Sequence, residues 1–584
     1  MKREKETKKD LSRRDFIKTT AVGVGATTLA GLGASKAAAS EGGVPTVWDY
    51  ESEVVVVGAG GAGLCAAIEA HDHGANVLVV EKQPEKTHYS NSRMSGGAYH
   101  SPDPASDRNA LEQYLLAMFS GENLPWKIEG EQPHVSEGIV ELFADYIVEN
   151  VQWLKSIDPD YSPTFTTGTS FPTFPGAQEL SKTYRTYSSR YPQGQTNPNI
   201  PPYEQPRMNK MSGEAFHECL MTGIKNRGIP ILYSTRAKGL VKSDGQIIGV
   251  LATRDSREIA VKAKRAVVLT AGGYEYNVAQ RRAFLKGPGV RGWVFYGSPD
   301  NTGDGISMAI EVGAGLAKVG KAASRIEIGI PYGRGYEETG LKMGMISFGQ
   351  EQPNSFIVDN HGKRYWNEPQ IVDATQPYRY QFYEEALKYD MKAMDYPRVP
   401  SWLVFDETMR ARQPLTRFDI STAGFRFIPW TPDNMDAINR GWILKAETIE
   451  ELAAKIKADP ENRTLMNAGT LVETATNFNS YAASGVDLEF GRVARTMGPV
   501  EKPPYYACKF YPGGPNTKGS IDADGQRHVL DWEGKPIPRL YTAGEMSSTF
   551  KFVYQGGGNI TECIVCGRIA GKNAAAEAPW YSKG

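Results

Sequence analysis

The chain has 584 residues, with 66 Lys and Arg against 67 Asp and Glu, and a net charge of −1 at pH 7. This length allows two or three domains with sizeable hydrophobic cores. The near balance of charges creates no long-range positive field, which argues against a nucleic-acid partner and against an anionic membrane surface. Many of the 61 glycines gather in short runs beside apolar segments. Such runs let the backbone approach a ligand closely.

Residues 1–45 have the layout of an export signal. A basic start is followed by Arg13 and Arg14, by an apolar stretch at residues 21–34 (AVGVGATTLAGLGA), and by an Ala-rich segment with a cleavage site near Ala39. The paired arginines resemble the bacterial twin-arginine signal, which implies the twin-arginine translocase as a partner and a periplasmic or otherwise extracytoplasmic location. A disordered basic tail is the alternative. The apolar stretch is too short to span a bilayer and no later segment qualifies, so we expect no integral membrane segment in the mature chain.

The five cysteines favour neither a disulfide framework nor a metal site. They are scattered, and Cys563 and Cys566 form a C-x-x-C pair without the second pair that zinc would need. Gly567 follows where covalent haem attachment would require His. We interpret the pair as small residues packed in a helix and predict no bound metal.

A dinucleotide-binding pattern begins at residue 52. Residues 52–58 (SEVVVVG) form a β-branched run typical of a buried parallel strand, and a helical segment and a second strand ending at Glu81 follow. Gly58 permits a tight turn, Gly60 lets the backbone reach a pyrophosphate, and Gly63 lets the helix pack on the strand. Glu81 stands where a carboxylate accepts hydrogen bonds from an adenosine ribose. The predicted cofactor-binding fingerprint is Gly58, Gly60, Gly61, Gly63 and Glu81.

Four further motifs, in order along the mature chain, resemble the fumarate reductase and succinate dehydrogenase flavoprotein superfamily. They are residues 91–97 (NSRMSGG), 270–273 (TAGG), 301–305 (NTGDG) and 541–545 (YTAGE). The resemblance implies FAD as the cofactor, with the first motif under the flavin ring and the second on a strand that returns beside it. The cofactor-binding residues implied in addition to the fingerprint are Lys82, Asn91, Ser92, Ser95, Gly96, Gly97, Ala271, Gly272, Asp304, Gly544, Glu545, Asn559 and Ile560.

The resemblance also implies an α/β fold class, with a discontinuous Rossmann-type FAD-binding domain and an inserted α+β capping domain. We expect the signal peptide and linker in residues 1–45, the FAD-binding domain in 46–317 and 501–584, and the capping domain in 318–500. Substrate is expected between the cap and the flavin, because ligand sites often lie at domain interfaces. Residues 159–207 form an insert rich in Pro, Thr and Tyr. It is either a surface loop or a segment whose aromatic side chains line the pocket.

A late glycine-rich loop, residues 556–561 (GGGNIT), leads into a predicted helix. By resemblance, the first amides of this helix would face the pyrimidine edge of the flavin. A positive helix end there stabilises the negative charge that reduced flavin develops. The alternative is an ordinary glycine-capped helix start.

The catalytic motifs of fumarate reductases are incomplete in this sequence. Val372 stands in the place of the proton-donating Arg, and residues 515–520 (PNTKGS) replace the H-H-T-x-G-G of the family. The Arg that clamps a substrate carboxylate is replaced in residues 552–559 (FVYQGGGN). Because valine cannot transfer a proton, these changes argue against a C4 dicarboxylate substrate.

The replacements resemble the 3-ketosteroid dehydrogenase branch of the superfamily. Residues 517–520 (TKGS) and 554–558 (YQGGG) stand in the place of its T-K-G-G and Y-x-G-x-G motifs. This resemblance implies that the Tyr554 hydroxyl and the Gly558 amide donate hydrogen bonds to a substrate carbonyl, as an oxyanion-type site for an enone. Tyr554 packed as a core aromatic is the alternative.

The proton donor or base is unassigned. The catalytic Tyr of the ketosteroid dehydrogenase branch is also replaced by Val372, and the nearest candidates are Tyr378, Arg379 and Tyr380. Arg379 is weak as a base because its guanidinium stays charged, whereas the two tyrosines carry a hydroxyl that can donate or accept a proton.

The sequence therefore predicts an exported FAD-dependent oxidoreductase that acts on CH–CH bonds. We expect it to reduce a carbonyl-conjugated double bond of a small organic substrate by hydride transfer from N5 of FAD. Electrons would come from a separate cytochrome or quinol-linked protein, because no nicotinamide pool is expected outside the membrane and the chain has no haem motif. Three alternatives remain: the reverse dehydrogenation, reduction of an unsaturated carboxylate as in fumarate reductases, and a non-catalytic electron-transfer flavoprotein.

Overall fold

The computed structural model describes residues 44–120, 135–136, 138–167, 174–180, 182–188, 213–285, 287–322, 325–347, 349, 352–369, 381–416, 428–550 and 556–580. The predicted export signal in residues 1–43 lies outside them. So do Tyr378, Tyr380 and Tyr554, three of the residues predicted to be catalytic, and Val372.

The first sheet is built around parallel strands, in the order β19-β20-β9-β1-β2-β6. β1 pairs in parallel with β2 and β9, β20 pairs in parallel with β9, and β6 pairs in parallel with β2. Val54 and Val56 of β1 pack into one core, and Val55 and Val57 pack into another. Burial on both faces explains the unbroken β-branched run. The strands are β1 (Tyr50–Val57), β2 (Val77–Val80), β6 (Ile231–Leu232), β9 (Arg257–Leu269), β19 (His528–Leu530) and β20 (Pro536–Thr542).

Two strands extend this sheet in antiparallel pairing. β7 (Thr235–Ser243) pairs with β8 (Gln246–Arg254), and β8 pairs with β9. β20 comes from the last part of the chain, yet it lies beside β9 in the sheet. The first domain is therefore discontinuous in sequence, as predicted.

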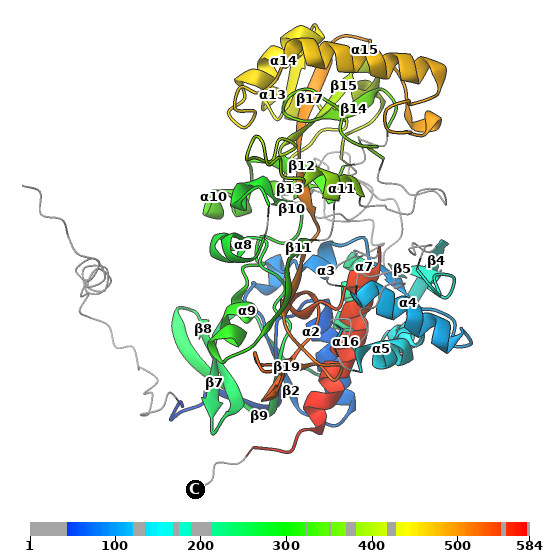
Figure 1. Cartoon of the computed structure of the whole chain (residues 1–584). Helices are drawn as coiled ribbons and strands as arrows, with labels where there is room; N and C mark the ends of the chain where they lie inside the picture. The colour runs from blue at the N-terminus through cyan, green and yellow to red at the C-terminus, as the bar shows by residue number, and fades with distance from the viewer. Residues whose placement is uncertain are drawn as a thin grey trace, which may run out of the picture. The chain divides into compact units, whose positions relative to one another are not determined.

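Two helices from opposite ends of the sequence pack together over the parallel sheet (Figure 1). α2 (Gly61–Asp72) joins β1 to β2, and α16 (Gly558–Ala576) lies against it. A Cβ atom on Gly571 would lie 2.2 Å from the carbonyl oxygen of Ala66. The absence of a side chain there lets the two backbones approach closely.

The second sheet is mostly antiparallel, in the order β10-β13-β12-β17-β15-β14, with β16 also paired to β17. β10 and β17 lie outside the predicted range 318–500, so the second sheet extends beyond both predicted domain boundaries. These boundaries stay a prediction. The strands are β10 (Val294–Phe295), β12 (Arg325–Ile330), β13 (Met343–Met345), β14 (Ser355–Val358), β15 (Ser401–Asp406), β16 (Ile443–Ala446) and β17 (Tyr505–Gly514).

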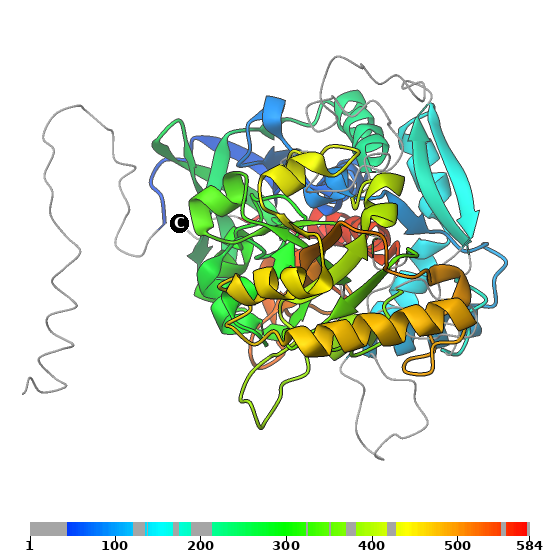
Figure 2. The same cartoon turned by 90° about the horizontal axis from the view of Figure 1, so that it is seen from above.

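Helices cover one face of the second sheet. α14 (Ile449–Ala458) and α15 (Ala468–Ser484) lie next to each other in the view from above (Figure 2). Phe356 and Val404 pack with Leu452 and Phe478 of these helices, while Ile357 packs into a separate core on the other face. The second sheet and its helices therefore have their own hydrophobic cores.

The remaining elements connect or cover the sheets. The other described α-helices are α3 (Asn91–Met94), α4 (Arg108–Ser120), α5 (Ile139–Ile147), α6 (Asn150–Ile157), α7 (Gly213–Asn226), α8 (Val278–Phe284), α9 (Asp304–Glu311), α10 (Arg334–Thr339), α11 (Gln381–Ala386), α12 (Glu407–Arg412) and α13 (Met435–Asn439). β11 (Leu316–Ala322) and β18 (Thr517–Ile521) form a two-stranded antiparallel sheet.

The described part of the Pro-, Thr- and Tyr-rich insert contains two strands. β4 (Tyr161–Thr167) and β5 (Lys182–Ser188) pair with each other and with β3 (Ala98–His100) in a small antiparallel sheet. The hydroxyl groups of Tyr99 and Tyr161 hydrogen-bond. This part of the insert is therefore not a plain loop, because β3 offers it an edge for pairing.

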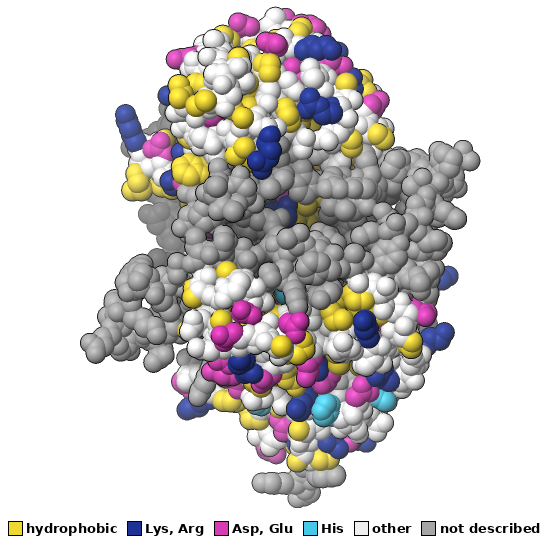
Figure 3. All heavy atoms as spheres, turned by 90° about the vertical axis from the view of Figure 1, so that its right-hand side faces the viewer, with side chains coloured by type: hydrophobic (Ala, Val, Ile, Leu, Met, Phe, Trp, Pro, Cys, Tyr) yellow, Lys and Arg dark blue, Asp and Glu magenta, His cyan; other side chains and the backbone are white. Residues whose placement is uncertain are grey.

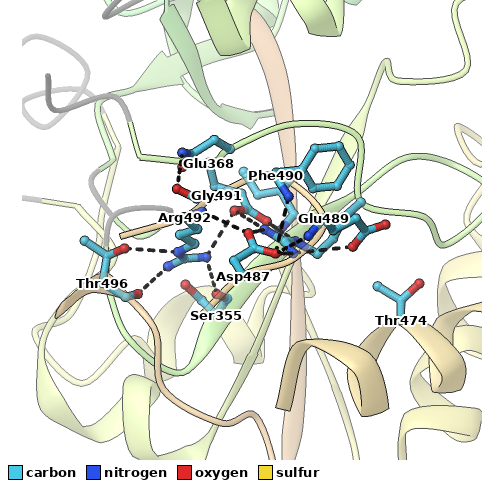
Figure 4. A network of polar contacts seen from close by, with 12 residues as sticks. Ser355, Glu368, Thr474, Asp487, Glu489, Phe490, Gly491, Arg492 and Thr496 are labelled. Atoms are coloured by element: carbon cyan, nitrogen blue, oxygen red, sulfur yellow. Dashed lines mark hydrogen bonds and ion pairs between the residues drawn. The ribbon is translucent and has the colours of Figure 1, made fainter. Parts of the chain in front are cut away.

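A buried ionic network joins segments around the second sheet (Figure 4). Arg364 donates to both carboxylate oxygens of Glu368, at 2.7 and 2.9 Å, and to Asp487 at 2.9 Å. Arg492 lies 3.3 Å from Glu368 and donates to the backbone oxygen of Ser355 at 2.8 Å. The side chains of the two arginines and of Glu368 and Asp487 are fully shielded from solvent. Each charge therefore depends on its partners.

The described surface shows no region dominated by one sign of charge in the view of Figure 3, where Lys and Arg alternate with Asp and Glu. Among the described residues, no helix is both long and apolar enough to cross a membrane.

Candidate functional site

A cavity lies at the carboxyl ends of four parallel strands. Its wall includes Val57 and Gly58 at the end of β1, Val80 and Glu81 at β2, Thr270 and Ala271 at β9, and Ala543 and Gly544 at β20. Open α/β sheets bind ligands at this edge. The first turns of α2 and α16 complete the wall, through Gly61, Ala62, Asn559 and Ile560.

Most of the predicted cofactor-binding residues come together on this wall. They are Gly58, Gly60, Gly61, Glu81, Lys82, Asn91, Ser92, Ser95, Ala271, Gly272, Asp304, Gly544, Glu545, Asn559 and Ile560. Gly63, Gly96 and Gly97 are predicted cofactor residues that do not line the cavity, and neither does the predicted carbonyl donor Gly558. Contact with a cofactor stays a prediction for each of them.

The turn after β1 explains why its glycines are needed. Gly58 has a φ of +106°, and a Cβ atom there would lie 2.7 Å from the carbonyl oxygen of Thr270. A Cβ atom on Gly63 would lie 1.9 Å from the carbonyl oxygen of Gly58. At Gly60 an added Cβ atom would lie 3.6 Å from Cβ of Ser90, an ordinary van der Waals contact, so the turn itself does not exclude a side chain there. Gly58 and Gly63 are needed for the conformation and close packing of the backbone, whereas a side chain at Gly60 would extend along the cavity wall.

Glu81 is buried and already held by the backbone. It accepts hydrogen bonds from the amides of Ala59 and Gln83, each at 2.8 Å. Nε2 of His88 lies 3.7 Å from the Glu81 carboxylate. Burial lowers the pKa of His88, so this ring is neutral near pH 7. The bonds fix the orientation of Glu81 and leave each oxygen a second lone pair for a ligand.

Asp304 begins α9 and is paired with two cations. Lys82 lies 3.0 Å and Arg236 2.8 Å from its carboxylate. Burial alone would raise the pKa of Asp304, but Lys82 and Arg236 outweigh it and lower the pKa. Lys82 is thereby oriented at the cavity wall.

The start of α16 presents an uncapped helix end to the cavity. Gly557 precedes it with a φ of +90°, no side chain caps it, and its first turn contains no acidic residue. Asn559 and Ile560 line the cavity. Free amides and the helix dipole make such an end favourable for negative charge.

Residues from several further segments of the chain complete the site. Asn91 donates to Glu545 at 2.9 Å and accepts from the amide of Ser298 at 2.6 Å. The neighbouring wall residues Tyr296 and Gly297 were not indicated by the sequence. Pro515 and Asn516, from the segment that replaces a fumarate reductase motif, also line the wall. Asn301 also lines the wall, and its Nδ2 has no hydrogen-bond partner among the described residues. A polar ligand fits such an open donor.

A comparison with protein families gives a match to an FAD binding domain over residues 53–561. The chain belongs to this family. FAD is therefore its cofactor, and the predicted α/β fold class and the predicted FAD-dependent oxidoreductase are confirmed.

Similar proteins place the family within the fumarate reductase and succinate dehydrogenase flavoprotein superfamily. The chain is 25% identical to an NADH:fumarate oxidoreductase of Klebsiella pneumoniae over 94% of its own length and 50% of that protein, so it spans about half the length of this relative. It is 27% identical to a 3-oxosteroid 1-dehydrogenase of Mycolicibacterium smegmatis over 91% of its own length and 99% of that protein. The fold is similar to that of a 3-ketosteroid Δ1-dehydrogenase from Sterolibacterium denitrificans, with a TM-score of 0.70, 23% identity, and 90% and 99% of the two chains covered.

The residues of the cavity wall are suited to FAD, the cofactor of this family. The α2 end that faces the cavity has no acidic residue in its first turn, which suits a pyrophosphate. The Gly61 amide donates to the hydroxyl of Ser92 at 2.7 Å. In the described part of the chain, no group of His, Cys, Asp or Glu side chains is suited to hold a metal ion.

Proposed function

We propose that the protein is an exported reductase of a carbon–carbon double bond conjugated to a carbonyl group. The observation that carries the proposal is the start of α16, because Asn559 and Ile560 line the cavity directly after the predicted carbonyl donor Gly558. Thr517, from the segment that resembles the ketosteroid dehydrogenase motif, donates to Glu545 on the same wall at 3.3 Å. The fumarate oxidoreductase and the 3-oxosteroid dehydrogenase among the relatives support chemistry at a carbon–carbon bond.

FAD, when bound, supplies the hydride. The Gly558 amide and the Tyr554 hydroxyl would donate to the carbonyl oxygen and stabilise the enolate that forms as the β-carbon accepts the hydride. Tyr378 or Tyr380 would then deliver the proton to the α-carbon. The positive end of α16 would favour the negative charge on the reduced cofactor.

For the cofactor itself, we propose that the wall residues hold it along its length. The amides at the start of α2 would bind the pyrophosphate, and Glu81 would accept from the adenosine ribose. Asn91, Ser92 and Ser95 would lie under the flavin ring. Gly63, Gly96 and Gly97 would act through the backbone turns that place these side chains.

The location and electron source are part of the same proposal. Arg13 and Arg14 support export by the twin-arginine translocase to the periplasm or an equivalent compartment. A separate cytochrome or quinol-linked protein would then deliver electrons.

The test uses the FAD-loaded protein with reduced viologen as the electron donor. The acceptors are fumarate, an aryl acrylate and a 3-keto-4-ene steroid, and viologen oxidation is measured with each. We expect turnover of a carbonyl-conjugated alkene and none of fumarate. Fast turnover of fumarate alone would overturn the proposal, because Val372 replaces the proton-donating Arg.

The reverse dehydrogenation is the second candidate, favoured by the likeness to the 3-oxosteroid 1-dehydrogenase along nearly its whole length. A saturated ketone with an artificial electron acceptor tests it. Faster oxidation of the ketone than reduction of the enone would establish the reverse direction.

A further inference from the structure

A buried lysine contacts the cavity wall from behind. Lys518 of β18 is 1% exposed, and its ammonium group donates to Oδ1 of Asn559, which lines the cavity at the start of α16. It also donates to the hydroxyl of Ser548 at 3.1 Å and lies 3.8 Å from the carboxylate of Glu562. Lys518 does not itself line the cavity, so it reaches the wall through Asn559 and Glu562.

The surroundings of this ammonium group compensate its charge. The Glu562 carboxylate is buried as well, and it accepts from the hydroxyl of Ser548 at 3.0 Å and from that of Thr549 at 2.7 Å. Burial lowers the pKa of Lys518, and the Glu562 carboxylate opposes this change. The paired carboxylate and the two oxygen acceptors favour the charged form of the lysine, which only donates hydrogen bonds.

A partner that only donates determines which way the Asn559 amide points. The Asn559 oxygen must face Lys518, so the amino group Nδ2 is left for other partners. It donates to Oδ1 of Asn516, another residue of the cavity wall, at 2.8 Å. Nδ2 of Asn516 in turn donates to the backbone oxygen of Thr517 at 2.8 Å. The chain of hydrogen bonds therefore has a single direction, which begins at Lys518.

One hydrogen of the Asn559 amino group remains for a ligand. The group has two hydrogens, and among the described residues Asn516 is its one acceptor. Asn559 is half-buried and lines the cavity, so an acceptor atom of the cofactor can receive the second hydrogen. Reduction increases the negative charge on the flavin ring, and protein groups close to the ring tune its chemistry through such contacts.

We propose that Lys518 is a positioning residue for the flavin. It holds the Asn559 amino group toward the cavity, where this group donates to the cofactor and binds its reduced form more tightly than its oxidised form. The preference arises because a hydrogen bond to an ionised acceptor is about twice as strong as one to a neutral acceptor. This inference rests on the proposed placement of the flavin at the start of α16, and it does not involve the alkene substrate.

Potentiometric titration of the FAD-loaded protein without substrate tests this role. Lys518→Met keeps most of the side-chain length but cannot donate. We expect it to weaken the binding of reduced FAD about tenfold relative to oxidised FAD. This change lowers the midpoint potential of the two-electron couple by about 30 mV. An unchanged potential in a Lys518→Met variant that retains FAD overturns the proposal.

Lys509→Met is the matched control. Lys509 is also paired with two carboxylates, those of Asp459 at 2.9 Å and Glu461 at 2.8 Å, but it lies outside the cavity wall. Its midpoint potential should equal that of the wild type. A fall as large as that of Lys518→Met would overturn the proposal, because loss of a paired lysine far from Asn559 would then suffice.

Asn559→Leu separates positioning from a direct effect of the lysine charge. It removes the amide and leaves Lys518 with Ser548 and Glu562. We expect its potential to fall by a similar amount, and Lys518→Met to cause little further change in this background, since the two residues act as one unit. A further fall as large as in the wild-type background overturns the proposal.

An unchanged potential in Asn559→Leu overturns the proposal as well, and this result decides the question if Lys518→Met does not retain FAD. Because no alkene is present in any of these titrations, failure of the proposed alkene reduction would leave their results unaffected.

Discussion

Gly60 is a residue of the glycine turn that lines the cavity. An added Cβ would lie 3.6 Å from Cβ of Ser90, so the turn tolerates a first side-chain atom. A larger side chain would extend toward the space proposed for the cofactor. We expect Gly60→Val to fold and to bind FAD about tenfold more weakly or worse, a change of at least about 1.4 kcal/mol.

The ratio of flavin absorbance to protein absorbance measures this loss. Gly239→Val in β7 is the control, since a Cβ atom there meets nothing closer than 4.0 Å and the residue does not line the cavity. Full FAD content in Gly60→Val would refute the assigned role of the turn.

The hydroxyl of Tyr554 is the side-chain group proposed to polarise the substrate carbonyl. Tyr554→Phe removes this hydroxyl alone, so the protein should fold and retain FAD. We expect enone reduction to fall about 100-fold, the scale of about 3 kcal/mol for one oxyanion donor. Steady-state rates with the best acceptor measure it, and a variant as fast as the wild type would contradict the carbonyl-site assignment.

At the residue scale, the glycines that the backbone conformation requires could be predicted from the sequence. Gly63 is required by a close contact with the carbonyl oxygen of Gly58 within one local turn, and Gly58 by its positive φ, and the local spacing of the glycines reveals both. Tyr296 and Gly297 carry no local signal. A Cβ atom on Gly297 would lie 2.5 Å from Oδ1 of Asn91, a residue about 200 positions away in sequence, so only the tertiary fold reveals this contact.

At the scale of elements, the Arg364 and Glu368 network fixes the loop after β14 to the segment after α15. Burial alone would raise the pKa of Glu368, but Arg364 and Arg492 outweigh it and lower the pKa. A carboxyl group with a lowered pKa stabilises the folded state above its unfolded pKa, about 4.3 for Glu, and loses this contribution as pH falls below it.

We therefore expect Glu368→Gln to lower the free energy of unfolding at pH 7 by about 3 kcal/mol, because it leaves two buried guanidinium groups undercompensated. The difference from the wild type should shrink as pH falls below about 4.3, because Glu368 binds a proton in the unfolded state there before it does so in the folded state. Urea unfolding at each pH measures both effects. Glu473→Gln on the exposed side of α15 is the control and should have little effect. A difference independent of pH would contradict the ionised state of Glu368.

The predicted elements were more accurate in type than in extent. The run at residues 52–58 gave a buried parallel strand because its pattern is local, and β1 ends at Val57. The second sheet was harder to delimit, since β10 has two residues and pairs with strands far away in sequence. The insert was also harder, because β4 and β5 depend on pairing with β3.

At the scale of the whole molecule, the proposed export signal would determine where the enzyme works. Arg13→Lys and Arg14→Lys together preserve the charge and remove the paired arginines that a twin-arginine receptor recognises. We expect the double variant to remain in the cytoplasm with its FAD bound. Cell fractionation followed by immunoblotting measures this, with Lys2→Arg and Lys5→Arg as a charge-preserving control outside the pair. Unchanged export of the double variant would point to another route.

The cavity is assembled from both ends of the sequence, which has a consequence for biosynthesis. β1 and α2 leave the ribosome early, whereas Asn559 and Ile560 of the same wall belong to α16 and leave it late. Translation proceeds from the N-terminus at roughly 5–20 residues per second, so the first glycine turn waits on the order of one minute for its partner helix. During that interval the nascent chain holds an open half-site. Synthesis and cofactor capture are thereby separated in time, and a ribosome stalled before residue 558 would carry a chain without its flavin.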